Sequence, residues 1–186
     1  MKKYLQDYLF LFLIAGTIVA LDQWTKYLVR TYLQFCEVWA PQPWMIDYAR
    51  IVHWRNSGAA FGMLQQFGGV FMVLAILVSL AILYFFPQVD RRDWPLRLAM
   101  CMQLGGALGN LIDRLTQGGE VTDFISVGNF AVFNVADASI SVGVAVLILG
   151  LWIKDYQQKK NPTAGQPPAM LSQAETVPQT EEIEGE

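Results

Sequence analysis

Four long apolar blocks, separated by shorter polar segments, dominate the pattern of hydrophobic and polar positions along the chain. They cover about residues 5–25, 67–87, 97–114 and 137–154. A helix needs about 20 apolar residues to cross a bilayer, and each block comes close to that length. The pattern therefore predicts a membrane α-helical protein with four transmembrane helices.

The amino terminus, Met1-Lys2-Lys3 followed by an apolar run, is similar to a secretory signal peptide. No small-x-small cleavage site follows Ala20, and the chain continues directly into Leu21-Asp22-Gln23. We therefore expect the first helix to stay uncleaved and to serve as a membrane anchor.

The polar segment at residues 22–66 predicts a small structure outside the bilayer. It contains Trp39, Trp44 and Trp54, and a run of β-forming residues at 49–54. Aromatic side chains of this kind favour the membrane–water interface. We expect a small extracytoplasmic β-cradle at about residues 35–60.

Two glycine patterns carry further structural information. Gly105, Gly106 and Gly109 recur at small-residue spacing in the third block, which predicts close approach of neighbouring helices. Residues 124–136 are uncharged but have Gly128-Asn129 in the middle, which favours a strand pair or a re-entrant turn over a membrane span.

The distribution of basic residues predicts the orientation, because cytoplasmic loops carry an excess of Lys and Arg. Four spans place both termini on one side, and we expect that side to be cytoplasmic. It has eight basic residues and the other side has five. The eight are Lys2, Lys3, Arg91, Arg92, Arg97, Lys154, Lys159 and Lys160; the five are Lys26, Arg30, Arg50, Arg55 and Arg114.

The composition agrees with a membrane protein: 54% of residues are hydrophobic, 16% are charged, and the mean hydropathy is +0.32. The net charge of −3 arises in residues 161–186, which carry five Glu and no Lys or Arg. We expect one domain over 1–160 followed by a disordered acidic tail. No basic patch suggests a nucleic-acid partner, and Cys36 and Cys101 are expected to be free.

Carboxylates near long apolar runs are costly and usually functional. Asp113, Asp123 and Asp137 all lie within residues 105–139, between or beside the apolar blocks. Two carboxylates in a partly dry site share a proton, so that one acts as general base towards water and the other as general acid. A helix start at Asp137 favours its ionised form, and with it the role of base. This chemistry needs no metal and no cofactor.

The polar residues beside the apolar blocks also have plainer structural interpretations. On these interpretations Asp123 is an interfacial acid, Asp137 is an N-cap, Asp22 with Lys26 is a helix-end ion pair, and Asp113-Arg114 is a hydrogen-bond hub. His53 is a surface strand residue, although its spacing to Ser57 also suggests a serine hydrolase.

The acid–base chemistry of such a carboxylate pair is that of an aspartyl protease, and other classes of protein are alternatives to it. A small transporter would predict two related halves, and the polar clusters are unlike one another. A non-catalytic assembly subunit leaves the acidic clusters unexplained. Zinc-dependent and presenilin-type intramembrane proteases need HExxH and GxGD, which are absent from the sequence.

Five motifs in order closely resemble those of the bacterial lipoprotein signal peptidase family, also called signal peptidase II. They are Asp22-Gln23 with Lys26; residues 56–61 (NSGAAF); residues 105–114 (GGALGNLIDR); residues 121–124 (VTDF); and residues 133–137 (FNVAD). The resemblance covers roughly residues 10–155. It departs from the family pattern at Ala138, where several members have a hydroxyl residue, and here the hydroxyl is on Ser139.

The resemblance implies an aspartyl endopeptidase of the bacterial inner membrane. We expect a monomer, and the orientation given above places its site near the outer face. Asp123 and Asp137 would be the catalytic pair. The substrate would be a prolipoprotein bearing diacylglyceryl-cysteine, cleaved just before that cysteine, with membrane lipids as further partners. The residues implied to line or support the site are Asp22, Lys26, Asn56, Gly58, Asn110, Asp113, Arg114 and Asn134.

Overall fold

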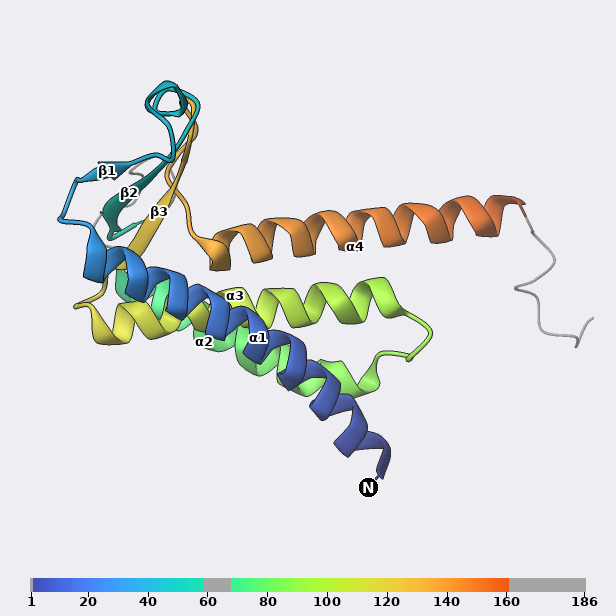
Figure 1. Cartoon of the computed structure of the whole chain (residues 1–186). Helices are drawn as coiled ribbons and strands as arrows, with labels where there is room; N and C mark the ends of the chain where they lie inside the picture. Colours follow the sequence, from blue (N-terminus) through green and yellow to red (C-terminus); the bar gives the residue numbers. More distant parts are fainter. Residues whose placement is uncertain (1, 59–67, 161–186) are drawn as a thin grey trace, which may run out of the picture. The chain divides into compact units, whose positions relative to one another are not determined.

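The computed structural model describes residues 2–58 and 68–160, so the predicted acidic tail lies outside the described residues. Four helices and three strands form most of the chain (Figure 1). In chain order these are α1 (Lys2–Tyr32), β1 (Val38–Trp39), a 3-10 turn (Pro43–Met45), β2 (Ala49–Asn56), α2 (Gly68–Phe85), a second 3-10 turn (Phe86–Gln88), α3 (Trp94–Thr116), β3 (Val121–Val127) and α4 (Val135–Lys160).

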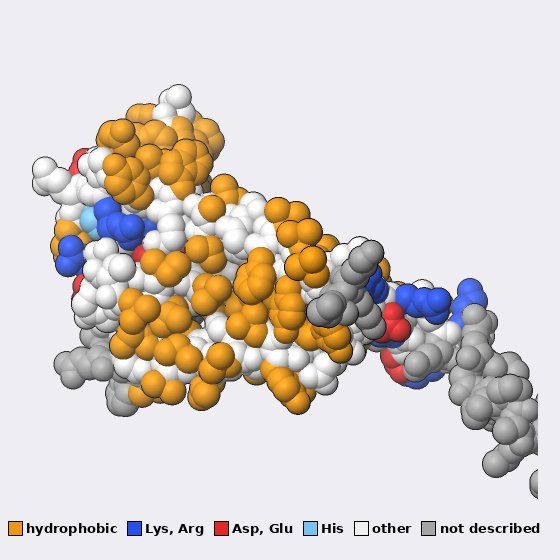
Figure 2. All heavy atoms as spheres, turned by 90° about the horizontal axis from the view of Figure 1, so that it is seen from below, with side chains coloured by type: hydrophobic (Ala, Val, Ile, Leu, Met, Phe, Trp, Pro, Cys, Tyr) orange, Lys and Arg blue, Asp and Glu red, His pale blue; other side chains and the backbone are white. Residues whose placement is uncertain are grey.

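The predicted class, a helical membrane protein with a small sheet, is confirmed. Three described helices are long and apolar enough to cross a membrane: Tyr4–Tyr32, Gly68–Gln88 and Val135–Gln157. Hydrophobic side chains cover much of the face in Figure 2, and the histidine and several charged side chains gather at the left. Helix α3 has the length of a span but is less apolar, because it packs between other helices and carries buried polar groups.

The first helix is longer than predicted. The sequence placed its end at about residue 25, whereas α1 continues to Tyr32. The charges at Asp22, Lys26 and Arg30 suggested the end of a span. Their spacing of four residues instead places them on one face of a continuing helix, where Asp22 pairs with Lys26. Lys26 and Arg30 in turn pair with Asp113 of α3.

Glycines of α3 allow the close helix packing that their spacing predicts. The compact unit Met1–Gly150 contains these contacts. A Cβ at Gly105 would lie 2.8 Å from Cβ of Ile18 in α1, and one at Gly106 would lie 2.6 Å from the carbonyl oxygen of Ala136 in α4. At these glycines α1 and the first turn of α4 therefore lie closer to α3 than a side chain on α3 would allow.

The three strands form one antiparallel sheet in the order β1–β2–β3. Strand β2 pairs with β3 from Ala49 opposite Val127 to Asn56 opposite Val121. The register shifts between Ile51 and Trp54, where β2 has one residue more than β3. The sheet lies where α1 and α3 end and α4 begins (Figure 1). The predicted small sheet is confirmed, and it includes one strand, β3, from outside the predicted residues 35–60.

The opposite end of the helices is held by a separate buried ion cluster. Asp7 of α1 accepts hydrogen bonds from Arg97 of α3 at 2.8 Å and from Arg91 at 2.9 Å. The guanidinium of Arg97 also lies over the rings of Phe10 and Phe86. This cluster fixes α1 against α3 at the end remote from the sheet.

Candidate active site

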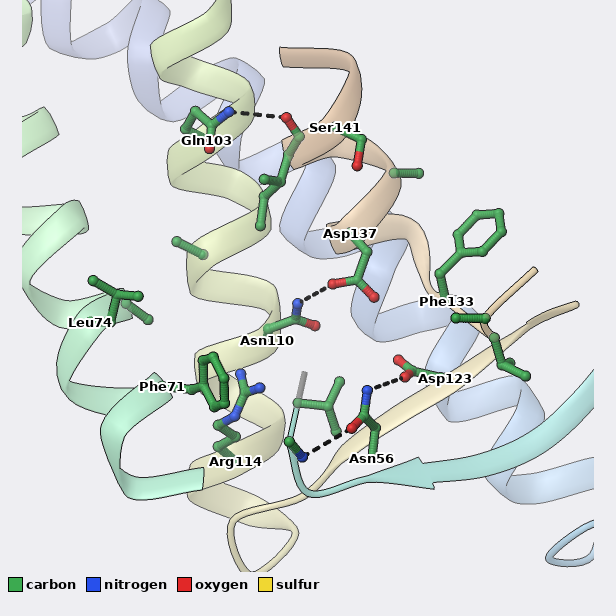
Figure 3. Close-up of a pocket in the computed structure, with 18 of the residues that line it drawn as sticks. Asn56, Phe71, Leu74, Gln103, Asn110, Arg114, Asp123, Phe133, Asp137 and Ser141 are labelled. Carbon is green, nitrogen blue, oxygen red and sulfur yellow. Dashed lines mark hydrogen bonds between the residues drawn. The ribbon is translucent and has the colours of Figure 1, made fainter. Parts of the chain in front are cut away.

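A cavity of about 640 Å³ lies between α2, α3, β3 and the first turns of α4. Its wall is mostly apolar, and most of its polar side chains gather around Asp123 and Asp137 (Figure 3). Six of the residues that the sequence proposed for the site line this cavity: Asn56, Gly58, Asn110, Arg114, Asp123 and Asp137.

Asp123 reaches the cavity from the middle of β3 and is fully buried. Its Oδ2 accepts a hydrogen bond from Nδ2 of Asn56 at 2.9 Å, and its Oδ1 accepts one from Nδ2 of Asn134 at 2.6 Å. Asn56 is the last residue of β2 and lies diagonally across the sheet from Asp123. The pairing of β2 with β3 thus delivers the amide to the carboxylate.

A tight turn brings Asp137 back to Asp123. Gly128 has a φ of 51°, in the left-handed region that glycine adopts without strain, and Phe133 then pairs with Ile125 of β3. Helix α4 begins immediately afterwards. The chain reversal therefore places the first turn of α4 next to the middle of β3 (Figure 3).

Asp137 and Asn134 cap α4 reciprocally. The side chain of Asn134 accepts a hydrogen bond from the backbone N–H of Asp137 at 2.9 Å, and Oδ2 of Asp137 accepts one from the backbone N–H of Asn134 at 3.3 Å. This is the arrangement of a capping box. The N-cap of α4 is therefore Asn134 and not Asp137, which lies within the first turn and returns the hydrogen bond. Asp137 also lines the cavity, where its Oδ1 accepts a further hydrogen bond from Asn110 at 2.7 Å.

Three asparagine amides have their orientations fixed by donors on their oxygens. The oxygen of Asn56 accepts from the backbone N–H of Gly58, that of Asn134 accepts from the N–H of Asp137, and that of Asn110 accepts from Lys26. Each NH₂ group is left to donate towards a carboxylate. The amides hold the two carboxylates at fixed positions.

A buried ion network lies behind the cavity. Lys26 is fully buried and contacts Asp22 at 2.8 Å and Asp113 at 3.4 Å. The other oxygen of Asp22 accepts the backbone N–H of Ala136, in the first turn of α4. Oδ2 of Asp113 accepts the N–H of Thr122, next to Asp123. The pair Asp22–Lys26 is therefore buried and not an exposed helix-end pair. Asp22 connects α1 to the start of α4, and Lys26 connects α1 through Asp113 to β3.

Arg114 lines the cavity beside the dyad, and its guanidinium lies 5.3 Å from the ring centroid of Phe71. Its buried Nε has no hydrogen-bond partner among the described residues. The hub interpretation of Asp113-Arg114 therefore holds for Asp113 alone. Arg114 presents a positive charge to the cavity instead.

Burial and, second, the nearby carboxylate of Asp137 raise the pKa of Asp123 to about 7. The hydrogen bonds from Asn56 and Asn134 act in the opposite direction but do not offset the burial. At neutral pH Asp123 is therefore available as a proton donor. No three His, Cys, Asp or Glu side chains among the described residues form a cluster suited to a metal ion.

His53 is buried, contrary to the predicted surface position. Its Nδ1 contacts the backbone oxygen of Leu33 at 2.9 Å, and its ring packs against Phe35. The extra residue in β2 turns this part of the strand inward. The ring therefore contributes to packing at the end of α1, away from the cavity.

The sequence reasoning missed two residues that complete the ion network. Gln23 donates to Asp22, to Asp113 and to the backbone oxygen of Gly109, and Arg30 donates to Asp113 and Thr122. The signal for Arg30 was present, because it follows Lys26 by four residues on the same helix face.

Residues 14–153 match the family model described as signal peptidase (SPase) II. The chain belongs to the signal peptidase II family. The family is the A8 family of peptidases, so the chain is an aspartic endopeptidase of the signal peptidase II type, as the motifs indicated.

Similar proteins support this membership over most of the chain. The lipoprotein signal peptidase of Halalkalibacterium halodurans is 35% identical over 157 residues, covering 82% of this chain and 98% of the relative. That of Brevibacillus brevis is 38% identical over 144 residues, covering 76% and 94%. A solved bacterial membrane enzyme is similar with a TM-score of 0.72 and 31% identity, over 84% of this chain and 93% of that one. The chain is accordingly a multi-pass membrane protein.

Proposed function

We propose that the protein removes signal peptides from prolipoproteins whose cysteine carries diacylglycerol, and that Asp123 and Asp137 perform the hydrolysis. The observation that carries the proposal is their shared position in one cavity, each held by oriented amides. Membership of the signal peptidase II family supports the substrate class.

In this mechanism Asp137 is the base and Asp123 the acid. Ionised Asp137 takes a proton from water, whose oxygen attacks the carbonyl carbon of the residue before the cysteine. Protonated Asp123 donates to the carbonyl oxygen. In the second step protonated Asp137 donates its proton to the cysteine nitrogen, and ionised Asp123 takes a proton back from a hydroxyl group of the tetrahedral intermediate. The C–N bond breaks, the signal peptide leaves with a new carboxyl terminus, and both carboxyl groups return to their starting protonation states. The raised pKa of Asp123 supports its role as acid.

The remaining polar side chains take supporting roles. Asn56, Asn110 and Asn134 orient the two carboxylates, and Asp22, Lys26 and Asp113 hold the segments that bear them. Arg114, whose side chain lines the cavity beside the dyad, would pair its guanidinium charge with a substrate oxygen. Gly58, whose N–H fixes the amide of Asn56, completes this part of the site.

The apolar part of the cavity fits the lipid and the signal helix of such a substrate. Its wall includes Leu74 and Val78 of α2, Ala107 of α3 and Ile140 of α4. A diacylglyceryl cysteine anchors its peptide bond near the membrane boundary. We place the catalytic domain, residues 1–160, in the inner membrane as a monomer with cytoplasmic termini, so that the sheet and the dyad lie near the outer face.

The test is cleavage of a purified prolipoprotein by the full-length enzyme in detergent, followed by intact-mass analysis. The matched control substrate is the same polypeptide with an unmodified cysteine. We expect a single product that begins at the lipidated cysteine, and no cleavage of the control. Equal cleavage of both substrates would contradict the substrate class, and cleavage at another bond would contradict the site of hydrolysis.

A further inference from the structure

The two carboxylates accept hydrogen bonds from asparagine amides, and they differ in the groups that contact the oxygens of those amides. Oδ1 of Asp137 accepts from Nδ2 of Asn110 at 2.7 Å, and the oxygen of the same amide accepts from Nζ of Lys26 at 3.0 Å. A cation on its oxygen polarises an amide and strengthens the donation by its NH₂ group. Asp137 is therefore connected to a buried positive charge through one side chain.

Asp123 has no cation on the oxygen of either amide that donates to it. Its donor Asn134 meets Lys26 only at a shared acceptor, because Nδ2 of Asn134 also donates to Oδ1 of Asn110 at 3.1 Å. Its donors are Asn56 and Asn134, and the oxygens of these amides accept from the backbone N–H groups of Gly58 and Asp137. Both donor amides are neutral, and the groups that donate to their oxygens are neutral as well. Asp123 is also fully buried, whereas Asp137 is only half-buried at the cavity wall. An ionised carboxylate is therefore better accommodated at Asp137.

The cation is held firmly. Lys26 has no exposed surface and lies between Asp22 of its own helix and Asp113 of α3. The other charged groups around this network are Arg30 on Asp113, Arg114 at the cavity wall, and the two dyad residues. Of the cations in the part of the chain that the structure describes, only Lys26 donates a hydrogen bond to Asn110, the amide that in turn donates to Asp137.

We infer that Lys26 is a positioning residue that acts through Asn110 to keep Asp137 as the ionised member of the dyad, so that the shared proton resides on Asp123. The inference rests on the proposed function and deepens it, because it assigns the base and the acid by a contact outside the cavity.

The experiment measures kcat/KM against pH between about 4 and 9 for the wild-type enzyme with a diacylglyceryl-modified prolipoprotein. The informative variants are Lys26→Met, which removes the cation, and Asn110→Leu, which removes the link while leaving Lys26 with Asp22 and Asp113. We expect the midpoint of the acidic limb to move upward by about one pH unit in both variants, which corresponds to about a tenfold stronger hold on the proton.

Arg97→Met is the matched control. It removes another buried cation from the same set of helices, but one that pairs with Asp7 at the opposite end of α3, about 20 Å from Asn110 by helix rise. We expect it to lower the unfolding temperature and to leave the acidic midpoint unchanged. A merely structural role for Lys26 would give the same behaviour in Lys26→Met.

Unchanged acidic midpoints in Lys26→Met and Asn110→Leu, in an enzyme that cleaves its substrate, would overturn the inference and leave the proposed function intact. If Lys26→Met does not fold, Lys26→Gln takes its place, because it removes the charge and keeps a side chain that can donate to Oδ1 of Asn110. Absence of cleavage by folded wild-type enzyme would contradict the proposed function itself, and the inference would fall with it.

Discussion

Gly109→Ala tests whether the packing of α3 positions the site. A Cβ at this position would lie 2.6 Å from Oδ2 of Asp22, a distance that real Cβ contacts do not show. Asp22 has no freedom to retreat, because its oxygens are bound by Lys26, Gln23 and the N–H of Ala136. The substitution therefore moves α1 away from α3 or breaks the buried ion pair.

The sign of the effect follows from two opposing contributions. Alanine is favoured over glycine within a helix by about 1 kcal/mol. Overpacking costs about 1–3 kcal/mol, and breaking a buried ion pair adds about 3–5 kcal/mol. The net loss is therefore about 0–2 kcal/mol if α1 only moves away, and about 3–7 kcal/mol if the ion pair also breaks. In both cases we expect cleavage to fall more than the folded fraction, because displaced Asp22 releases the first turn of α4.

The assay is thermal unfolding in detergent together with the rate of cleavage per folded molecule. Gly16→Ala is the matched control, because Gly16 lies in α1 with no neighbouring atom within 4 Å of an added Cβ. We expect Gly16→Ala to be neutral or slightly stabilising. A Gly109→Ala enzyme as stable and as active as the Gly16→Ala enzyme would refute the packing argument.

Three further predictions follow from the charged groups. With the pKa of Asp123 raised to about 7 and its protonated form required, kcat/KM should fall as the pH rises through about 7; a flat profile up to pH 9 would contradict the assignment. Because the pKa of Asp123 rises from 3.8 to about 7 on folding, ionisation of Asp123 lowers the free energy of unfolding by up to about 4 kcal/mol as the pH rises from about 4 to about 7. Asp123→Asn should therefore weaken the dependence of the unfolding temperature on pH. The same dependence in the variant would contradict the raised pKa. Asp7→Asn leaves Arg97 buried without its charged partner and should lower the unfolding temperature without changing the cleavage rate per folded molecule; an unchanged unfolding temperature would contradict the role of this pair.

The membrane class and the helices were predictable because each depends on local patterns. Long apolar blocks specify spans whatever they pack against, and the glycines of α3 specify close approach. The end of α1 was not predictable in the same way. Lys26 and Arg30 suggest a membrane boundary until Asp113, far away in the sequence, is known to neutralise them.

The sheet shows a second limit. The run at 49–54 indicated a strand, and it lies in β2. Gly128-Asn129 indicated a strand pair or a re-entrant turn, and it lies directly after β3. Their common membership of one sheet depends on pairing between β2 and β3, which are about 70 residues apart, and no local pattern specifies such pairing. The inward turn of His53 depends on the same register shift, so its burial could not be predicted either.

The candidate site was predictable as a set of residues and not as a geometry. Motif order identified Asp123, Asp137 and their asparagines. The individual hydrogen bonds could not be predicted, because they join atoms from distant parts of the sequence. The hydrogen bond from Lys26 to Asn110 is an example. The roles of these residues stay predictions until they are measured.

The most direct test of the account compares cleavage by Asp123→Asn, Asp137→Asn and Ser141→Ala enzymes. Ser141 lines the same cavity without contacting either carboxylate through any hydrogen bond of the described residues, and it serves as the control. With each enzyme shown to be folded, we predict that both aspartate variants leave a lipidated prolipoprotein uncut while Ser141→Ala cleaves it. Cleavage at a wild-type rate by either aspartate variant would contradict the central claim that Asp123 and Asp137 together perform the hydrolysis.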